Sequence, residues 1–156
     1  MIKYVDTKVV FQEYPDEITL AINISNCPYH CPECHSSYLA EDIGTELTNE
    51  EVDKLITNNE GITCVGLMGG SAGDVLRIAR YIKEVSDLKV GWYTGAEKVP
   101  DYVLLNLHNF DYIKVGPYKK ELGPLTSKTT NQRYYKVIDN SLVDFTYLFN
   151  GNKNSI

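Results

Sequence analysis

The sequence predicts an α/β protein built around a parallel sheet. Strand-like and helical segments alternate along its 156 residues, and this alternation is typical of βαβ units. The length is enough to bury the core of one domain but falls short of the roughly 250 residues of a closed (β/α)8 barrel. Because no internal repeat or linker interrupts the pattern, we expect one domain over residues 1–149 and a disordered tail over residues 150–156.

The first half of the chain supplies three predicted strands and one predicted helix. Lys8–Phe11 and Thr19–Ile24 are rich in β-branched and apolar residues, so we expect strands there. Thr48-Asn-Glu-Glu51 is a capping-box pattern with apolar residues at helical spacing behind it, which predicts the start of a helix. Ile62–Met68 is a short apolar run typical of a buried strand.

The second half continues the alternation. Apolar residues recur at steps of three and four over Ala72–Val85, which predicts an amphipathic helix. Leu88–Tyr93 is expected to be a strand, and Pro100–Leu107 suits a short helix with proline near its start. Phe110–Val115 is the last strand that the pattern indicates.

Three cysteines, Cys27, Cys31 and Cys34, form a C-x3-C-x2-C run directly after the predicted strand Thr19–Ile24. A closed structural zinc site and a cluster held only by protein thiolates each take four ligands. Three thiolates around a four-iron cluster leave one iron open to a small molecule, so the spacing predicts a reactive metal centre. Cys64 lies within a predicted strand and is expected to be a buried apolar thiol.

Three further loops with special residues follow predicted strands. They are Met68-Gly69-Gly70-Ser71, Tyr93-Thr94-Gly95 and Lys114-Val-Gly-Pro117. In parallel α/β architectures, chemistry collects at the carboxyl ends of the strands. We therefore expect these loops and the cysteine segment to meet at one edge of the sheet.

Composition excludes several other classes of protein. The net charge of −6, without a lysine and arginine cluster, argues against nucleic-acid binding. No run approaches the roughly 20 apolar residues of a membrane span, and the charged first residues do not suit a signal peptide. We expect a cytoplasmic protein, in which clustered cysteines bind metal more often than they form disulfides.

With these motifs in place, the chain resembles the radical S-adenosylmethionine (SAM) superfamily, whose signature is a C-x3-C-x2-C loop after the first barrel strand. The resemblance implies a partial, laterally open (β/α)6-type parallel barrel. It also implies that Cys27, Cys31 and Cys34 hold a [4Fe-4S] cluster whose fourth iron binds SAM. Reduction of that cluster would cleave SAM to methionine and a 5′-deoxyadenosyl radical.

The same resemblance implies a set of SAM contacts: Glu33, Gly69, Gly70, Ser71, Thr94 and Lys114. Gly69-Gly70 is similar to the glycine-rich loop that meets the SAM amino group, and two glycines allow a ligand to approach the backbone closely. Many family members carry an acidic residue where Ser71 stands, and Asp74 is a candidate to compensate. Lys114 would pair with the SAM carboxylate.

Within the superfamily, the chain resembles the activating proteins of the anaerobic (class III) ribonucleotide reductases over residues 17–138. The segments that carry this likeness are Trp92-Tyr-Thr-Gly95, Val115-Gly-Pro-Tyr118 and Thr130-Asn-Gln-Arg133. The implied reaction removes a Cα hydrogen from a glycine of the reductase large subunit and leaves a glycyl radical. Asn131 and Arg133 would position SAM or this partner, and a flavodoxin or ferredoxin would donate the electron.

Two alternatives stay open. A zinc module could use the three cysteines with His30 or His35, although common zinc signatures use paired C-x2-C units. Alternatively, a small radical SAM enzyme could act on a metabolite such as a deazapurine precursor. Tyr134, Tyr135 and Tyr147 are expected to be packing residues.

Overall fold

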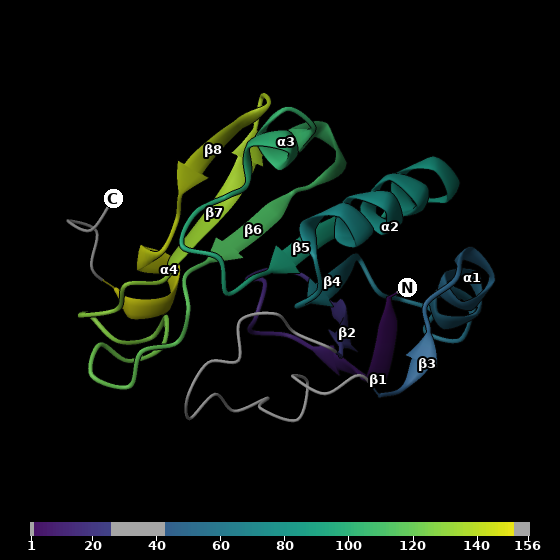
Figure 1. Cartoon of the computed structure of the whole chain (residues 1–156), viewed down its shortest axis with the longest axis horizontal. Coiled ribbons are helices and arrows are strands. Elements are labelled where there is room, and N and C mark those ends of the chain that lie inside the picture. The colour runs from purple at the N-terminus through teal and green to yellow at the C-terminus, as the bar shows by residue number, and fades with distance from the viewer. Residues whose placement is uncertain (1, 26–42, 152–156) are drawn as a thin grey trace.

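A computed structural model describes residues 2–25 and 43–151 of the chain. Within these residues, eight strands form one open mixed sheet with the order β3-β1-β2-β4-β5-β6-β7-β8 (Figure 1). The elements in chain order are β1 Lys3–Val10, β2 Thr19–Ile24, β3 Thr45–Glu46, α1 Asn49–Thr57, β4 Cys64–Met68, α2 Ala72–Val85, β5 Lys89–Tyr93, α3 Asp101–Leu104, the 3-10 helix η2 Leu107–Asn109, β6 Tyr112–Val115, β7 Arg133–Ile138, β8 Ser141–Asp144 and α4 Tyr147–Asn150.

The predicted parallel α/β core is confirmed, but the sheet is not parallel throughout. β2, β4, β5 and β6 are parallel neighbours, whereas β3, β1, β7 and β8 are antiparallel to the strands beside them. The segment between β1 and β2 contains no crossover helix, so it can only return the chain antiparallel. Because β3 and β8 stand at opposite ends of the strand order, the described residues show an open sheet and no barrel.

The β7–β8 hairpin was not predicted from the sequence. Its two loop residues, Asp139 and Asn140, have φ angles of 50° and 61°. Positive φ at both central residues is the property of a type I′ turn, whose twist matches that of the strands it joins. The hairpin therefore adds two antiparallel strands next to β6.

The helices follow the predicted periodicity closely. α2 has the predicted bounds, and Val75, Ile78, Ala79 and Ile82 form its buried face. α1 begins after Thr48, whose side-chain oxygen accepts a hydrogen bond from the backbone N–H of Glu51 at 3.1 Å. The helix predicted over 100–107 is shorter than expected, because α3 ends at Leu104 and the chain continues into η2.

The two faces of the sheet bury different side chains. One face packs against α1, α2 and α3 through aliphatic residues and Trp92. We call the opposite face the inner face; its buried cluster is Tyr14, Cys64, Tyr112, Leu125 and Tyr134. Alternate residues of each strand point to opposite faces, so β4, β5 and β6 contribute to both clusters.

Tyr14 covers the middle of the inner face. It comes from the segment between β1 and β2, and its side chain is fully buried. Gly66 and Gly91 pair in register on β4 and β5, and a Cβ atom built on either would lie within 2.5 Å of the Tyr14 ring. The two glycines therefore leave the space that the ring fills.

The end of the described chain bears on the predicted tail. Residue 150 is the last residue of α4, and the Asn150 side chain donates to the backbone carbonyl of Ser127 at 3.3 Å. Residues 152–156 lie outside the described part. In the described ranges, none of the helices has the length and hydrophobicity needed to cross a membrane.

Candidate functional site

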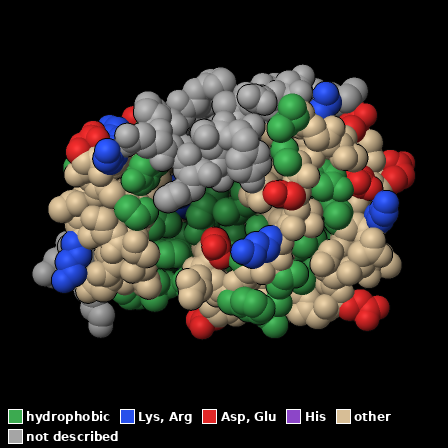
Figure 2. All heavy atoms as spheres, turned by 90° about the horizontal axis from the view of Figure 1, so that it is seen from below, with side chains coloured by type: hydrophobic (Ala, Val, Ile, Leu, Met, Phe, Trp, Pro, Cys, Tyr) green, Lys and Arg blue, Asp and Glu red, His purple; other side chains and the backbone are tan. Residues whose placement is uncertain are grey.

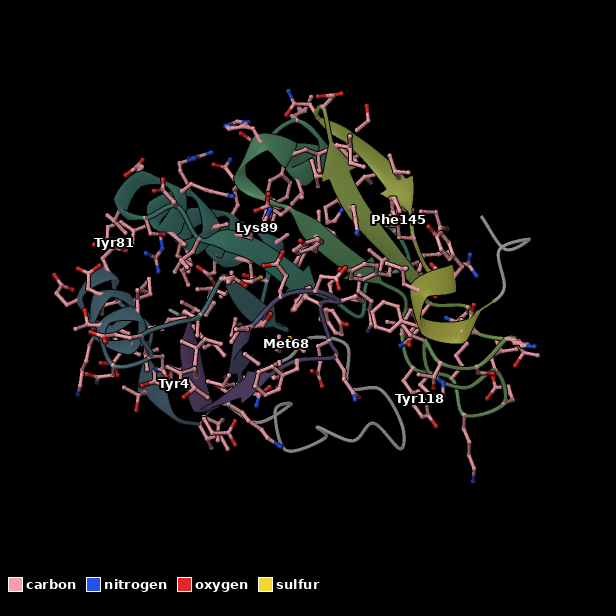
Figure 3. The ribbon with its side chains drawn as sticks, turned by 180° about the vertical axis from the view of Figure 1, so that it is seen from behind. Tyr4, Met68, Tyr81, Lys89, Tyr118 and Phe145 are labelled. Atoms are coloured by element: carbon pink, nitrogen blue, oxygen red, sulfur yellow. The ribbon has the colours of Figure 1, made fainter. Side chains whose placement is uncertain are left out.

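The carboxyl ends of four parallel strands meet at one edge of the sheet. Strand register aligns Asn23 with Met68, Met68 with Tyr93, and Tyr93 with Lys114. We call Asn23, Met68, Tyr93 and Lys114 the carboxyl-edge row. In Figure 3, Met68 marks this edge and Lys89 marks the opposite ends of the same strands. The loops predicted to carry chemistry all leave the sheet here.

Gly69 and Gly70 turn the chain from β4 toward α2. Both have positive φ angles, 102° and 85°. The Gly69 N–H donates to the Tyr93 carbonyl at 2.8 Å, and its carbonyl accepts from Trp92 Nε1 at 2.9 Å. A Cβ atom on Gly70 would meet side chains at 3.1–3.4 Å, including Val75. The glycine pair is therefore needed for its backbone conformation, and the Gly69 carbonyl already has a donor.

Ser71 and Asp74 lie together at the start of α2. Ser71 Oγ donates to Asp74 Oδ2 at 2.9 Å, and the Ser71 side chain makes no capping hydrogen bond to the helix. This contact places a carboxylate beside the exposed hydroxyl. Asp74, which the sequence offered as a candidate acidic group, therefore lies beside Ser71 after the carboxyl end of β4.

Thr94 and Lys114 connect the ends of β5 and β6. The buried Thr94 donates its N–H to the Lys114 carbonyl at 2.9 Å. Thr94 Oγ1 accepts from the Ala96 N–H at 3.2 Å, so the hydroxyl shapes the loop. Lys114 Nζ lies 5.1 Å from the centroid of the Tyr93 ring, which gives the row a cation against an aromatic face.

The Thr130-Asn-Gln-Arg133 segment clamps the turn after β6. Gln132, which is buried, donates from Nε2 to the Gly116 carbonyl at 3.2 Å. Asn131 Nδ2 donates to the Pro117 carbonyl at 3.1 Å, while its Oδ1 is buried and has no hydrogen-bond partner among the described residues. Both amide side chains thus lie against the backbone that follows β6.

The Arg133 side chain of β7 points toward β8, the second strand of the hairpin. Its Nη1 lies 3.2 Å from Asp144 Oδ2, with both side chains largely buried. Because β7 pairs Arg133 with Val115, this ion pair also sits near the end of β6. It holds β7 against β8 beside the site.

The predicted cluster ligands Cys27, Cys31 and Cys34 lie outside the described residues. The same is true of Glu33, His30 and His35. β2 ends at Ile24, and the Ser25 N–H donates to the Lys3 carbonyl at 3.0 Å, so the first described range, residues 2–25, ends just past the carboxyl end of β2. In the part of the chain that the structure describes, no group of three or more His, Cys, Asp or Glu residues could hold a metal ion.

The tyrosine side chains that lie beneath the carboxyl-edge row were not predicted from the sequence. The Tyr14 hydroxyl donates to Met68 Sδ at 3.7 Å, and the Tyr93 hydroxyl donates to the Glu13 carbonyl. Burial raises the pKa of both phenols well above the ordinary value, so they stay protonated. Gly66 and Gly91 were the available signal, because a glycine inside a strand often marks a close approach.

The face of the molecule that is seen from below Figure 1 has an apolar centre and separate charged side chains around it. Figure 2 shows hydrophobic side chains in a hollow in the middle of the face, with acidic and basic side chains at its margin. The fold and these contacts define an α/β protein with a candidate site at the carboxyl edge of its parallel strands. Comparisons of the chain with models of protein families, with curated proteins and with solved structures find no match.

Proposed function

We propose that this protein is a radical SAM activase that generates a glycyl radical on an anaerobic ribonucleotide reductase. The observation that carries the proposal is the place of the cysteine segment in the chain relative to the parallel strands. The C-x3-C-x2-C segment starts three residues after the end of β2, a parallel strand whose carboxyl end lies at the edge that carries Gly69, Thr94 and Lys114.

The residues at this edge fit the proposed cofactors. Three thiolates suit an iron–sulfur cluster that keeps one iron open, with Cys27, Cys31 and Cys34 as its ligands. Lys114 supplies a cation for a carboxylate, and Asn131 Oδ1 is a buried acceptor without a partner among the described residues. When bound, the reduced cluster and SAM would supply the radical that removes the glycine hydrogen.

The open sheet supports the proposed use of a protein as substrate. We interpret the mixed sheet as a partial, laterally open barrel of the (β/α)6 type, with the inner face as its interior. In the described residues, β3 and β8 end the sheet without pairing to each other. An open side would admit a segment of a large partner, whereas an enzyme for small molecules more often closes its site against water. A flavodoxin or ferredoxin in the cytoplasm would supply the electron.

The proposal is tested with protein purified and reconstituted without oxygen. Wild-type protein is expected to bind iron and sulfide, to cleave SAM when reduced, and to produce the doublet of a glycyl radical in electron paramagnetic resonance when the reductase is added. Replacement of Cys27, Cys31 or Cys34 by alanine should abolish cluster assembly and cleavage. Cys64→Ala is the matched control and should retain both.

Two results would contradict the proposal in different ways. A colourless protein that holds stoichiometric zinc and no sulfide would indicate a zinc module. SAM cleavage without a glycine-centred signal on the reductase would keep the radical chemistry but assign it to a metabolite.

A further inference from the structure

Four tyrosines form a continuous cluster on the inner face, beneath the carboxyl-edge row. The Tyr14 ring centroid lies 5.0 Å from that of Tyr93 and 5.7 Å from that of Tyr112. Tyr112 in turn lies 6.1 Å from Tyr134. Tyr93 is partly exposed at the candidate site, whereas the other three are buried. Oxidisable rings in contact therefore lead from the site into the interior.

One of these phenols has a base to receive its proton. The Tyr112 hydroxyl donates to Glu17 Oε2, and Glu17 is only 8% exposed. The other carboxylate oxygen, Oε1, accepts from Thr63 Oγ1 at 2.6 Å. The carboxylate is thereby fixed in place, and its Oε2 faces the phenol directly.

Among the described residues, the remaining phenols of the cluster have no such base. Tyr93 donates to the backbone carbonyl of Glu13, and Tyr14 donates to the thioether of Met68. The Tyr134 hydroxyl is buried without a hydrogen-bond partner. A carbonyl or a thioether cannot take a proton at ordinary pH, and a phenol that loses an electron must lose its proton to become a stable neutral radical. Oxidation of the cluster should therefore end at Tyr112.

We propose that the Tyr112–Glu17 pair is a radical sink, which takes up the oxidising equivalent of a strong one-electron oxidant that reaches the candidate site. Tyr112 loses one electron, which passes through the rings of Tyr14 and Tyr93 to the oxidant. The O–H bond of Tyr112 breaks, and the proton forms an O–H bond with Glu17 Oε2. An oxidant of the hydroxyl-radical class becomes hydroxide. The products in the interior are both neutral and face each other, so no unpaired charge is buried.

This sink would protect the site that the proposed function describes. Reduced iron and peroxide generate oxidants of the hydroxyl-radical class. The cysteine segment follows β2 in the sequence, and the carboxyl end of β2 lies at the same edge as Tyr93. The Tyr112–Glu17 pair itself needs neither cluster nor SAM, because any oxidant that reaches Tyr93 would suffice.

Flash oxidation of the full chain tests the proposal. A ruthenium tris-bipyridine photo-oxidant is used, and the tyrosyl radical is followed by its absorption and by electron paramagnetic resonance. Wild-type protein should give a long-lived neutral radical. Tyr112→Phe and Glu17→Gln should each shorten its lifetime about a hundredfold, within the range that a positioned proton acceptor contributes. Tyr134→Phe is the matched control, since this phenol lacks an acceptor, and should leave the lifetime unchanged.

Equal lifetimes in Tyr112→Phe and Tyr134→Phe, or an unaffected Glu17→Gln protein, would overturn the proposal. A second measurement uses the unsubstituted chain and so does not depend on a variant that folds. After sustained illumination, mass spectrometry should find oxidation at the buried Tyr112. Oxidation products found only at exposed tyrosines such as Tyr102, which is 44% exposed, would also overturn the proposal. Neither measurement requires SAM cleavage, so failure here is distinct from failure of the proposed activase.

Discussion

At the scale of single residues, the Cys64 thiol shows how burial changes the chemistry of a cysteine inside a strand. Burial raises its pKa from 9.0 to about 12. The unfolded chain releases this proton first, so the stability that the thiol contributes is complete below pH 9 and is lost as the pH rises toward 12. We predict a falling free energy of unfolding over this range, measured by denaturant titration at each pH.

The comparison with Cys64→Ala isolates this thiol from the tyrosines, several of which also have raised pKa values. The variant should lose about 1 kcal/mol at neutral pH, a typical cost for a core substitution. Its stability should fall less steeply with pH than that of the wild type. Parallel curves for the two proteins would show that the thiol does not titrate with folding.

A second prediction at this scale concerns Gly91. Its Cβ position lies 2.2 Å from Cε1 of Tyr14, a ring that is fully buried and cannot swing away freely. Gly91→Ala should therefore cost about 1–3 kcal/mol of stability by overpacking. Gly73→Ala is the control, because the nearest atom to its Cβ position, Tyr102 Oη, is 3.5 Å away and alanine favours the helix by up to about 1 kcal/mol. Thermal and denaturant unfolding of both variants would measure the difference.

The sequence predicted that the motif residues would lie at one edge of the sheet, and it missed the residues that are placed by packing. Gly69 and Thr94 follow strands and Lys114 lies near the end of one, so their place at one edge follows from parallel pairing alone. Tyr14 and Glu17 come from a segment with no helical or strand period, so no local pattern indicated that they cover the inner face. Their positions depend on contacts with strands that lie far away in the sequence.

At the scale of elements, the starts of the two main helices differ in a way that sequence alone did not show. Thr48 caps α1 through its side chain, but Ser71 at the same position of α2 bonds to Asp74 and caps nothing. Thr48→Ala should cost about 1 kcal/mol, as loss of an N-cap does. Ser71→Ala should be nearly neutral in the same unfolding measurement. A similar loss in both variants would mean that the Ser71 hydroxyl also supports its helix.

An element could be predicted where its own residues show a clear period. α2 was predicted with its bounds because Val75, Ile78 and Ile82 repeat at the helical period. β7 was missed because Arg133–Ile138 contains basic and aromatic side chains and shows no alternation of buried and exposed residues. The Asp139-Asn140 pair was the overlooked signal, since such residues favour a type I′ turn.

At the scale of the whole molecule, the two ends of the parallel strands are chemically different. The carboxyl ends carry the glycine pair, Thr94, Lys114 and the buried amide oxygen of Asn131. Near the amino ends, the Glu17 carboxylate accepts hydrogen bonds from the Thr63 and Tyr112 hydroxyls. The glycine pair and the other strand-end loops thus lie at one end of the parallel strands, and the buried carboxylate lies toward the other end.

Paired lysine variants test this difference between the two ends. Lys114 lies in the carboxyl-edge row, and Lys89 begins β5 at the opposite end, where it pairs with Cys64 in the strand register (Figure 3). If SAM binds at the carboxyl edge, Lys114→Met should weaken its binding about tenfold or more, because a lost charge-assisted contact costs at least about 1.4 kcal/mol. Lys89→Met should leave the affinity unchanged in the same calorimetric titration, made on protein that carries its cluster.

Thermal unfolding of both variants checks that the sheet is intact. Equal affinities for the two variants would remove Lys114 from the site, and a weaker affinity only in Lys89→Met would place the ligand at the wrong end of the strands for the chemistry proposed.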